Sequence, residues 1–348
     1  MPAPASTGAP SRPDPRRRRR LALVAAVTAV AVVLAGPPLF RSAAATLAAA
    51  GVVGALGRNG VGAGDLARPV PGEPVVYLVV GSDDRAALRP GAGARVAGHR
   101  ADMLALLAVP SRRGPVRLLS LPRDLRVRVP GHGVQKVGGA YEYGSRPLLA
   151  AVRGATGVAV HHQVEVDFAG LGRLVDALGG VVVDSPRPAR DVVTGLSLPA
   201  GRSRLDSRSA LAFIRSRTYQ ELREGRWEYV DPNDLGRIGR QHQFLAALLA
   251  AVRAAGPNPA VLRRAAAEVG RHVTVDGAFG VADARRWLRL LAGAAPGLSA
   301  SILPTRPRSE PGEAGSPFPP AHAGSSLQLV RREPDATAAL SAFAGSGG

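Results

Sequence analysis

The run VVYLVVGSDDR, residues 75–85, sets the fold class of this chain of 348 residues. Its first six residues are apolar without interruption, which is typical of a strand buried on both faces. Two similar apolar runs follow, at residues 103–109 and 116–121. Strands of this kind are buried when helices cover both faces of their sheet. We therefore predict an α/β domain that begins at residue 75.

Arginine and aspartate accompany each of these three strands. The first run ends in GSDDR (81–85), the motif RAD (100–102) stands directly before the second, and PRD (122–124) follows the third. In sheets covered by helices, ligands bind at strand ends, where loops bring polar side chains together over a rigid floor. The pattern predicts a polar site at one end of the sheet.

A βαβ-like unit follows, with helices predicted at residues 147–155 and 169–178 and strands at 161–167 and 181–183. Two adjacent histidines, His161 and His162, begin the first of these strands. No further histidine or carboxylate stands at a spacing typical of metal ligands, so we interpret both as exposed strand residues.

The stretch FIRSRTYQELREGRWEYVDPNDLGRIGRQHQF, residues 213–244, combines many arginines with apolar residues. Arg215 and Arg217 stand two apart, so they point to the same side if the chain there is extended. Asp234 begins a predicted helix in which Arg237 and Gln241 fall within roughly 60° of it, on the apolar stripe. Burying an unpaired guanidinium costs several kcal/mol, so these arginines need a phosphate or a carboxylate as partner. The stretch alone leaves both partners open.

Composition narrows the choice of chemistry. The formal net charge is +19, from 45 basic and 26 acidic residues, and this suits nucleic acid, an anionic membrane or a phosphorylated substrate. The absence of cysteine excludes disulfides, thiol nucleophiles and cysteine-bound metals. Lys136 is the single lysine, which suggests either a need for a compact ammonium or a chance survivor among arginines.

The N-terminus predicts a membrane anchor. Residues 1–20 end in five arginines, and residues 21–40 carry no charge over a length that crosses about 30 Å of hydrocarbon. The positive-inside rule places the leader in the cytoplasm, giving a single-pass type II protein of the cell membrane. The alternative is a cleavable signal peptide, because GPP (36–38) interrupts the run and SAAA (42–45) offers small residues. Both readings place the globular part outside the cytoplasmic membrane and argue against a nucleic-acid partner for it.

Seven motifs in this order resemble the LytR-CpsA-Psr family over residues 75–253. They are GSDDR (81–85), RAD (100–102), LPRDL (121–125), KVGGAYEYG (136–144), VEVDFAGLGRLVDALGGV (164–181), FIRSR (213–217) and DLGRIGRQ (234–241). The resemblance implies a three-layer α/β/α domain with a central mixed sheet. It also implies a site for the pyrophosphate of a polyprenyl-linked glycan, with the lipid in an apolar groove. Members of the family are understood to transfer glycopolymers from that carrier to peptidoglycan, with Mg²⁺ (or Mn²⁺).

The resemblance also assigns site residues. The metal ligands would be Asp83 and Asp102, because Mg²⁺ prefers carboxylates together with phosphate oxygens. The pyrophosphate would be bound by Arg100, Arg123, Lys136, Arg215, Arg217, Arg237 and Gln241, in line with the preference of phosphate for guanidinium donors. The catalytic residues would be Asp234, Arg123 and Arg237. We hypothesise that Asp234 takes the proton of the attacking hydroxyl.

Two departures from the family pattern stand out. Gly138 occupies a position where members usually have asparagine. The insert between Arg217 and Asp234 is long and contains Tyr219, Trp227 and Tyr229, which either cap the site, contact a glycan or pack in a solvated loop.

The predicted organisation has six segments: a basic cytoplasmic leader (1–20), a transmembrane anchor (21–40), a Gly/Pro-rich linker (41–74), the catalytic domain (75–255), a C-terminal helical extension (256–303) and a Pro/Gly/Ser-rich mobile tail (304–348). Three functions remain open for it. The first is the membrane-anchored phosphotransferase, the second a pyrophosphatase that uses water as acceptor, and the third a non-catalytic regulator that binds the lipid carrier.

Overall fold

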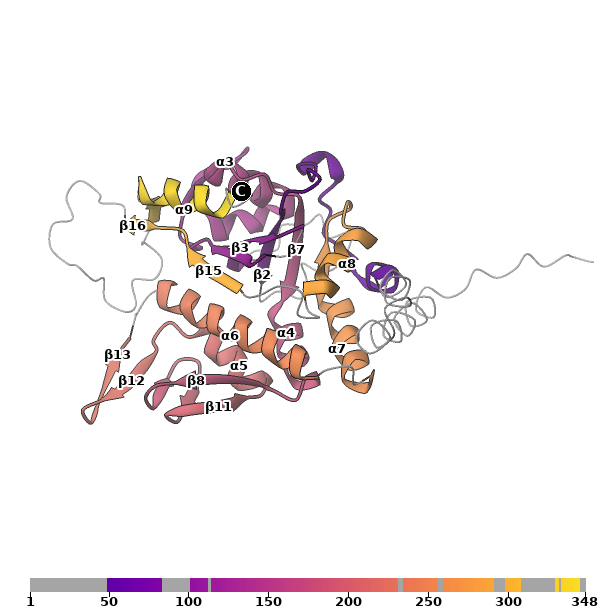
Figure 1. Cartoon of the computed structure of the whole chain (residues 1–348). Coiled ribbons are helices and arrows are strands. Elements are labelled where there is room, and N and C mark those ends of the chain that lie inside the picture. Colours follow the sequence, from indigo (N-terminus) through magenta and orange to yellow (C-terminus); the bar gives the residue numbers. More distant parts are fainter. Residues whose placement is uncertain are drawn as a thin grey trace, which may run out of the picture.

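A computed structural model of the chain has a mixed α/β fold built on a central mixed sheet (Figure 1). It describes residues 49–82, 101–111, 114–230, 234–255, 259–290, 298–307, 329–331 and 333–344. Within these ranges the central sheet has seven strands in the order β1-β14-β7-β2-β3-β4-β15. They are β1 (Gly57–Arg58), β2 (Val75–Ser82), β3 (Ala101–Val109), β4 (Val116–Ser120), β7 (His162–Asp167), β14 (Val273–Val275) and β15 (Leu298–Ile302).

The three apolar runs form neighbouring strands, as predicted. β2 runs antiparallel to β3, with Tyr77 opposite Leu107, and parallel to β7; β4 continues the sheet antiparallel to β3. Because side chains alternate along a strand, Leu78 and Leu106 enter a core on one face, while Tyr77 and Leu107 enter a second core on the other. Both faces are therefore buried, which explains why these runs show no polar alternation.

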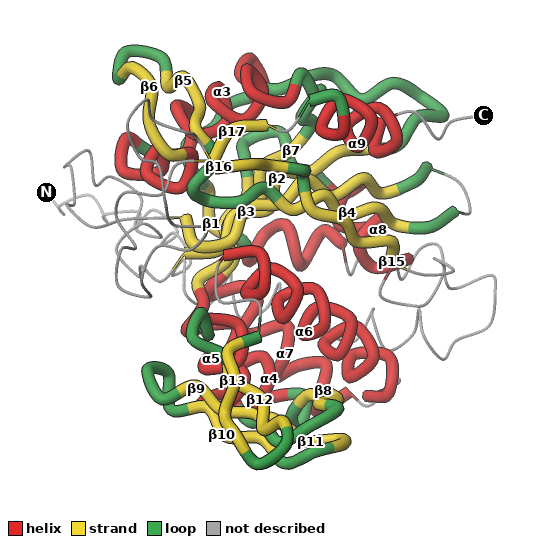
Figure 2. The backbone as a smooth tube through the Cα atoms, turned by 90° about the vertical axis from the view of Figure 1, so that its left-hand side faces the viewer, coloured by secondary structure: helices red, strands yellow, loops and turns green. Residues whose placement is uncertain are grey.

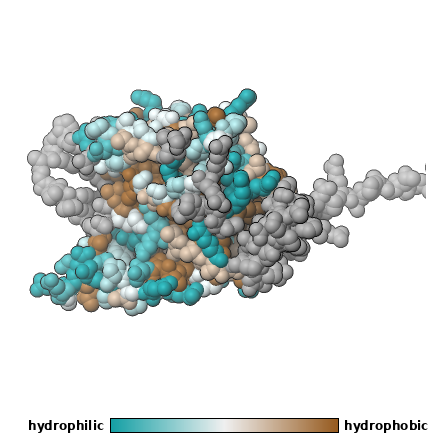
Figure 3. Space-filling model, in the orientation of Figure 1, coloured by the Kyte–Doolittle hydropathy of each residue, from teal (hydrophilic) through white to brown (hydrophobic). Residues whose placement is uncertain are grey.

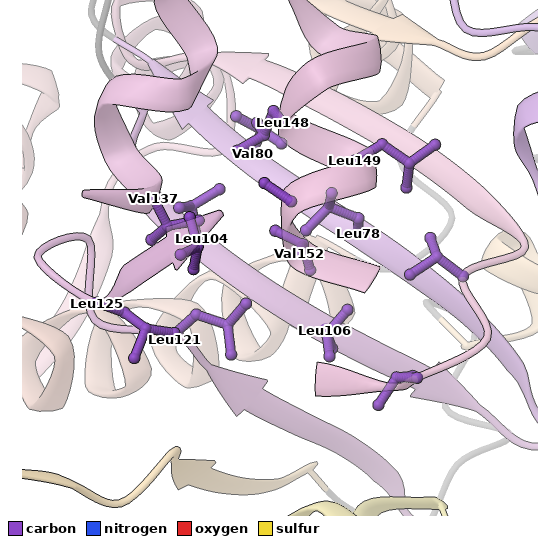
Figure 4. Close-up of a cluster of buried hydrophobic side chains, with 14 of the residues drawn as sticks. Leu78, Val80, Leu104, Leu106, Leu121, Leu125, Val137, Leu148, Leu149 and Val152 are labelled. Carbon is purple, nitrogen blue, oxygen red and sulfur yellow. The ribbon is translucent and has the colours of Figure 1, made fainter. Parts of the chain in front are cut away.

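Helix α3 (Ser145–Thr156) and helix α9 (Asp335–Ala344) cover one face of the sheet. Figure 4 shows Leu148, Leu149 and Val152 of α3 packed against Leu78 and Leu106. Helix α3 ends at Gly157, whose φ of 69° is the left-handed conformation that glycine adopts without strain. Apolar side chains of α3 and α9 therefore cover this face of the sheet.

Helices also lie on the other face of the sheet. They are α4 (Phe168–Ala177), α5 (Ser207–Arg215), α6 (Asp234–Ala255), α7 (Pro259–His272) and α8 (Val281–Arg289). Leu245 of α6, Val269 of α7 and Trp287 of α8 pack against the core of this face. Figure 2 shows α6 between the central sheet and a group of small strands further out. The predicted arrangement, with helices on both faces of a central mixed sheet, is confirmed.

Smaller strand groups complete the described part of the fold. A four-stranded group has the order β10-β9-β12-β13, and its strands β12 and β13 form the insert as an antiparallel hairpin. The bounds are β5 (Arg126–Val129), β6 (Gly133–Lys136), β8 (Val181–Ser185), β9 (Ala189–Asp191), β10 (Leu196–Leu198), β11 (Gly201–Leu205), β12 (Gln220–Arg223), β13 (Arg226–Tyr229), β16 (Thr305–Pro307), β17 (Leu329–Arg331), and the 3₁₀ helices η1 (Ala63–Asp65) and η2 (Val137–Tyr143).

The structure differs from the predicted segment boundaries on both sides of the domain. In the predicted linker, Leu56 and Val61 are buried and β1 pairs with β14. The predicted helical extension supplies two strands of the central sheet, β14 and β15. Part of the predicted mobile tail is helix α9, whose Leu340 and Phe343 belong to the core. Strands of three to five residues are too short for a periodic sequence pattern to identify them. The composition of α9 gives its apolar face no recognisable helical periodicity in the sequence.

The predicted leader (1–20) and transmembrane anchor (21–40) lie outside the described residues. In the part of the chain that the structure describes, no helix combines the length and the apolar composition needed to cross a membrane.

Candidate functional site

Three arginines surround one aspartate at the start of β3. Asp102 Oδ1 accepts hydrogen bonds from Arg123 Nη1 at 2.6 Å and from Arg217 Nη2 at 3.2 Å, and it lies 3.6 Å from Arg237 Nη1. Arg123 follows β4, Arg217 follows α5, and Arg237 lies in the first turn of α6. We call these four residues the arginine cluster. The structure thus brings together four residues that the sequence assigned to one site.

Asp234 holds two of these arginines. Its Oδ2 accepts a hydrogen bond from the backbone N–H of Arg123 at 3.3 Å, and its Oδ1 lies 3.7 Å from Arg123 Nε. The same Oδ1 forms an ion pair with Arg237, one turn along α6. Asp234 is only 8% exposed, and a carboxylate at a helix N-terminus is further stabilised by the helix dipole. Both oxygens of Asp234 therefore face arginine.

Lys136 joins the arginine cluster through a second carboxylate. Its Nζ lies 2.8 Å from Asp124 Oδ1, and Asp124 Oδ2 lies 4.0 Å from Arg123 Nε. With Asp124, Lys136 and Asp234 included, the site holds four cations and three carboxylates. The net positive charge leaves the site able to accept an anion.

The pKa values of Arg217 and Arg237 reflect this excess positive charge. Burial, together with repulsion from Arg237 and Arg123, lowers the pKa of Arg217 to about 10, at which it is still charged at neutral pH. Burial also lowers the pKa of Arg237, with repulsion from Arg123 acting in the same direction. The Nε atoms of Arg123 and Arg237 are buried, and neither has a hydrogen-bond partner among the described residues. Guanidinium groups in this state bind phosphate oxygens well.

The cluster is open to solvent at one of its arginines. The side chain of Arg217 is 41% exposed, whereas that of Arg237 is 3% exposed. A ligand that arrives from solvent would therefore meet Arg217 first and Arg237 at the floor of the site.

Arg215 and Gln241 take other positions. Arg215 is the last residue of α5, so the chain there is helical, and the predicted extended pairing with Arg217 is wrong. Arg215 is exposed, and its guanidinium lies 5.9 Å from the ring of Phe168. Gln241 is buried on the same face of α6 as Asp234, as predicted, and donates to the carbonyl of Ile214 at 3.3 Å. Gln241 thereby holds the C-terminal turn of α5 in place.

Asp191, which the sequence analysis missed, positions the segment that carries Arg217. Its Oδ2 accepts hydrogen bonds from Ser216 Oγ at 2.5 Å and from the backbone N–H of Thr218 at 3.0 Å. Its Oδ1 accepts from Thr218 Oγ1 at 2.9 Å and from the backbone of Val193 and Thr194. Asp191 is fully buried, which alone would raise its pKa, but these hydrogen bonds lower the pKa below its usual value.

Arg240 supports the same segment from α6. Its Nη2 donates to the carbonyl oxygen of Ser216 at 2.7 Å, and its guanidinium lies 4.6 Å above the ring of Tyr219. The residues on both sides of Arg217 are therefore fixed: Asp191 of β9 holds Ser216 and Thr218, and Arg240 of α6 also holds Ser216. No sequence pattern signals these contacts, because they join residues about 25 positions apart in different elements.

The predicted metal site is described only in part. Asp83 and Arg100 lie outside the described residues, within which no group of three histidines, cysteines or carboxylates lies close enough to hold a metal ion. Asp102 uses Oδ1 for its arginines, and its Oδ2 accepts no hydrogen bond from a residue in the described part of the chain. One carboxylate oxygen next to the arginine cluster fits Mg²⁺, which is typically held by few carboxylates plus phosphate and water.

Gly138 explains how closely the site is packed. Its backbone N–H donates to the carbonyl of Arg123 at 2.9 Å. A Cβ atom at this position would lie 2.9 Å from the carbonyl oxygen of Ala101 and 3.1 Å from Arg123 Cβ. The backbone of η2 therefore lies directly against the segments that contain Asp102 and Arg123. In this chain, an asparagine at position 138 would push these segments away from η2.

The insert between Arg217 and Asp234 is mostly a packed hairpin. Tyr219 is buried and meets Phe213 edge to face at 6.5 Å, and Trp227 lies 4.2 Å from the guanidinium of Arg190 on β9. Tyr229 is 53% exposed. Of the predicted roles, packing is therefore confirmed for Tyr219 and Trp227.

His162 lies in a second charged cluster, and the prediction that both histidines are exposed is wrong. His161 is 7% and His162 is 4% exposed. His162 Nδ1 lies 3.1 Å from Asp276 Oδ2 and its Nε2 lies 3.1 Å from Asp283 Oδ1. Asp283 also accepts from the hydroxyl of Tyr77 and from Arg286. We call Tyr77, His162, Asp276, Asp283 and Arg286 the histidine cluster. Ion pairs from His162 to Asp276 and Asp283 explain why this histidine is buried. The alternation of polar and apolar residues along the strand did not reveal these pairs.

The histidine cluster is satisfied within the protein. Burial alone would lower the pKa of His162, but its contacts with Asp276 and Asp283 raise this pKa to about 9. The ring is therefore charged at neutral pH and paired on both nitrogens. Such a network stabilises the contact between β7, the 276 turn and α8 and leaves no charge for a ligand.

Partly buried apolar side chains line the boundary between the sheet and α6. Val79, Val166 and Leu245 pack at the edge of one core, and Met103 packs against the core of the helical layer. We call these four residues the apolar seam. Figure 3 shows apolar residues reaching the surface between hydrophilic ones near the middle of this side of the molecule. The seam begins at Met103, next to Asp102 of the arginine cluster.

Comparison with known proteins gives one answer for the family. Residues 65–280 match the model of the LytR-CpsA-Psr family. A Corynebacterium glutamicum protein described as probable cell wall biosynthesis protein LcpB is 35% identical over 187 residues, which are 52% of this chain and 42% of that protein. TagU of Enterococcus faecalis, a polyisoprenyl-teichoic acid–peptidoglycan teichoic acid transferase, is 31% identical over 180 residues, 51% of this chain and 53% of its own. The chain spans about half the length of these relatives.

Solved structures agree with this result. The LytR-Csp2A-Psr enzyme from Actinomyces oris has a TM-score of 0.59 at 27% identity, covering 81% of this chain and 97% of that structure. TagT of B. subtilis has a TM-score of 0.56 at 19% identity, covering 83% of this chain and 99% of its own, and this likeness shows the fold alone. The family match covers more than half of the chain and includes every element that carries the arginine cluster. With its mixed α/β fold, the chain belongs to the LytR-CpsA-Psr family.

Proposed function

We propose that this chain is a membrane-anchored transferase that moves a glycopolymer from a polyprenyl-pyrophosphate carrier to peptidoglycan, outside the cytoplasmic membrane. The observation that carries the proposal is the arginine cluster. Arg123, Arg217 and Arg237 converge from three segments. Together with Lys136 they give the site one positive charge more than its three carboxylates, and the buried Nε atoms of Arg123 and Arg237 have no hydrogen-bond partner among the described residues. A pyrophosphate has the charge and the several oxygens that such donors bind.

The apolar seam supports a lipid-linked substrate. Met103 of the seam follows Asp102 directly, so a ligand with its pyrophosphate on the arginine cluster would place a lipid chain along the seam. Related proteins carry names that fit this substrate class. TagU is described as a polyisoprenyl-teichoic acid–peptidoglycan teichoic acid transferase, and a protein of the same fold, TagT, is described as bound to LI-WTA.

The proposed reaction is a phosphoryl transfer. A hydroxyl oxygen of the acceptor forms a bond to the phosphorus that carries the glycan, and the bond from that phosphorus to the lipid phosphate breaks. Negative charge grows on the departing lipid phosphate, where fixed guanidinium groups stabilise it. Asp102 Oδ2, with the predicted ligand Asp83, would hold Mg²⁺, which would neutralise phosphate charge. Arg217 receives the substrate at the open side, and Arg237 holds it from the floor of the site.

Asp234 has two possible roles in this reaction, and they are separable. As the predicted base it takes the proton of the attacking hydroxyl; as a positioning acid it holds Arg123 and Arg237, which both of its oxygens contact. Asp234→Asn abolishes transfer but preserves precursor binding if Asp234 is the base. A parallel loss of precursor affinity assigns the positioning role, and unchanged turnover removes Asp234 from the mechanism.

One experiment tests the function as a whole. The full-length chain is incubated with a labelled lipid-pyrophosphate glycan, Mg²⁺ and peptidoglycan. We expect label on the peptidoglycan. Release of free glycan phosphate instead identifies a pyrophosphatase, and substrate that stays bound and unchanged identifies a regulator that binds the carrier. Either result overturns the proposed transfer.

A further inference from the structure

A cavity of about 500 Å³ lies at the end of the sheet opposite the arginine cluster. Val76, Ala108 and Arg117 line it from three neighbouring strands, with Ala108 opposite both of the others. Val76 and Ala108 belong to the core under α3 and α9, whereas α6 packs on the other face. Asp102 is six residues from Ala108 along β3, which is about 20 Å. The cavity is therefore separate in both face and position from the arginine cluster and the apolar seam.

Arg117 brings an uncompensated positive charge to this cavity. Its Nε is buried, and its guanidinium forms neither a hydrogen bond nor an ion pair with any residue that the structure describes. Arg331, which also lines the cavity, differs because it is paired with Glu333 at 3.0 Å. Arg117 as a whole is half-buried, but a buried Nε without a hydrogen-bond partner is unfavourable, and an anion inside the cavity would supply that partner.

His161 adds a neutral hydrogen-bond donor to the same cavity. Its Nδ1 accepts a hydrogen bond from the backbone N–H of Val76 at 2.9 Å. Burial, together with the nearby charge of His162, lowers the pKa of His161, so the ring is neutral at neutral pH. A neutral ring that accepts at Nδ1 carries its proton on Nε2. The polar lining also contains the exposed Glu73 and the hydroxyls of Thr156, Thr337 and Ser341. Within it, Arg117 and His161 supply one unpaired guanidinium and one neutral N–H, which suit a single negative charge.

The remaining lining is largely apolar. Val158 follows α3, and Leu340 and Phe343 lie on α9; all three are buried in the core beneath these helices. Cavities of about 300 to 1,000 Å³ with apolar walls and few polar groups are typical of sites for small organic ligands. The volume and lining here fit a molecule with one acidic group and a short hydrocarbon chain.

We propose that this cavity binds a small amphiphilic carboxylate, with its acidic group on Arg117 and His161 and its hydrocarbon chain against Leu340 and Phe343. A carboxylate matches the fork of a single guanidinium in a bidentate pair. The ligand class differs from that proposed for the arginine cluster, where three arginines converge. The proposal does not depend on the proposed transfer reaction.

Isothermal titration calorimetry of the full-length chain with octanoate tests this site. We expect saturable binding that weakens at least tenfold in Arg117→Gln. The matched control is Arg128→Gln, which removes the same charge from an exposed position on β5 and should change the affinity less than twofold. Absence of binding to the unaltered chain, or equal affinity in Arg117→Gln, would overturn the proposal.

Two further measurements keep the test independent of folding. Ser341→Phe places a ring in the cavity from an exposed position on α9, so it should abolish octanoate binding while the melting temperature changes little. Octanol and octyl phosphate replace the carboxylate in parallel titrations. We expect both to bind at least tenfold more weakly than octanoate. Equal binding of octanol excludes an anion site, and tighter binding of octyl phosphate replaces the carboxylate assignment by a phosphate one.

Discussion

The arginine cluster and the histidine cluster bury similar side chains with opposite outcomes. In the histidine cluster, His162 is paired on both nitrogens, and Asp283 accepts from Tyr77 and Arg286. In the arginine cluster, three guanidinium groups share Asp102, and one of them, Arg217, is 41% exposed. The histidine cluster is closed by its own residues, and we propose that a ligand completes the arginine cluster.

This difference separates stability from function within one domain. A closed network loses stability when a member is removed, because the remaining buried charges lose their partners. An open network with excess positive charge loses little stability when one cation is removed, because the repulsion among its cations falls at the same time.

Asp283→Ala should destabilise the chain by about 3–5 kcal/mol, because it leaves His162, Arg286 and the hydroxyl of Tyr77 without their shared acceptor. Chemical denaturation monitored by circular dichroism measures this loss. Transfer activity per folded molecule, assayed at low temperature, should stay within twofold of the unaltered chain. A stable Asp283→Ala variant would show that the histidine cluster is not a stabilising network.

Arg217→Gln should reduce transfer by about 10²- to 10³-fold, the usual cost of removing one preorganised donor to a developing charge. Its midpoint of thermal unfolding should shift by less than 2 °C, a change of roughly 1 kcal/mol or less for a domain of this size. Paired assays of rate and melting temperature check both expectations. If the loss of rate were matched by a large loss of stability, the arginine cluster would be a structural network like the histidine cluster.

The stability of the chain should fall by about 3 kcal/mol between pH 6.5 and pH 10 through His162 alone. The folded pKa of His162 is about 9, above the unfolded value near 6.5, so the folded chain binds more protons in this range. The contribution is complete below pH 6.5 and is lost as the pH rises through 9. Denaturation of the unaltered chain and of His162→Gln at each pH gives the free energy of unfolding of both, and the His162 contribution is their difference. A difference that does not change between pH 6.5 and pH 10 would disprove it.

Asp191→Asn should reduce kcat/KM about tenfold, since it weakens the hydrogen bonds that fix Ser216 and Thr218 on either side of Arg217. Asp276→Asn is the matched control, because Asp276 is also fully buried and also holds a turn, but in the histidine cluster. Both variants should have a lower melting temperature than the unaltered chain. Only Asp191→Asn should raise KM for the lipid-pyrophosphate substrate, and an equal rise in both variants would reduce Asp191 to a structural residue.

Much of the central fold was predictable because its signals are local. The runs at residues 75–80, 103–109 and 116–121 are buried on both faces, so their continuous apolar character identified them directly. Asp234, Arg237 and Gln241 are all buried on α6, as their helical spacing predicted. The strands β14 and β15 and the helix α9 were missed, since short elements and biased composition carry little periodicity.

The candidate site was predictable in membership but not in geometry. The motifs identified Asp102, Arg123, Arg217 and Arg237 as members of one site, and these four meet in the structure. Arg215 is the last residue of α5, two residues before Arg217, so the chain there is not the extended segment that the sequence pattern considered. Partners such as Asp191 and Arg240 lie in other elements, and only the tertiary structure reveals them.

The single lysine offers a chemical handle on the site. Lys136 is the only lysine in 348 residues, and its ammonium is ion-paired with Asp124 beside Arg123. An amine-reactive reagent therefore has one side-chain target in the whole chain, apart from the α-amine of the N-terminus. The rate of labelling at Lys136, read by mass spectrometry of one peptide, would report occupancy of the neighbouring cluster without any engineered probe.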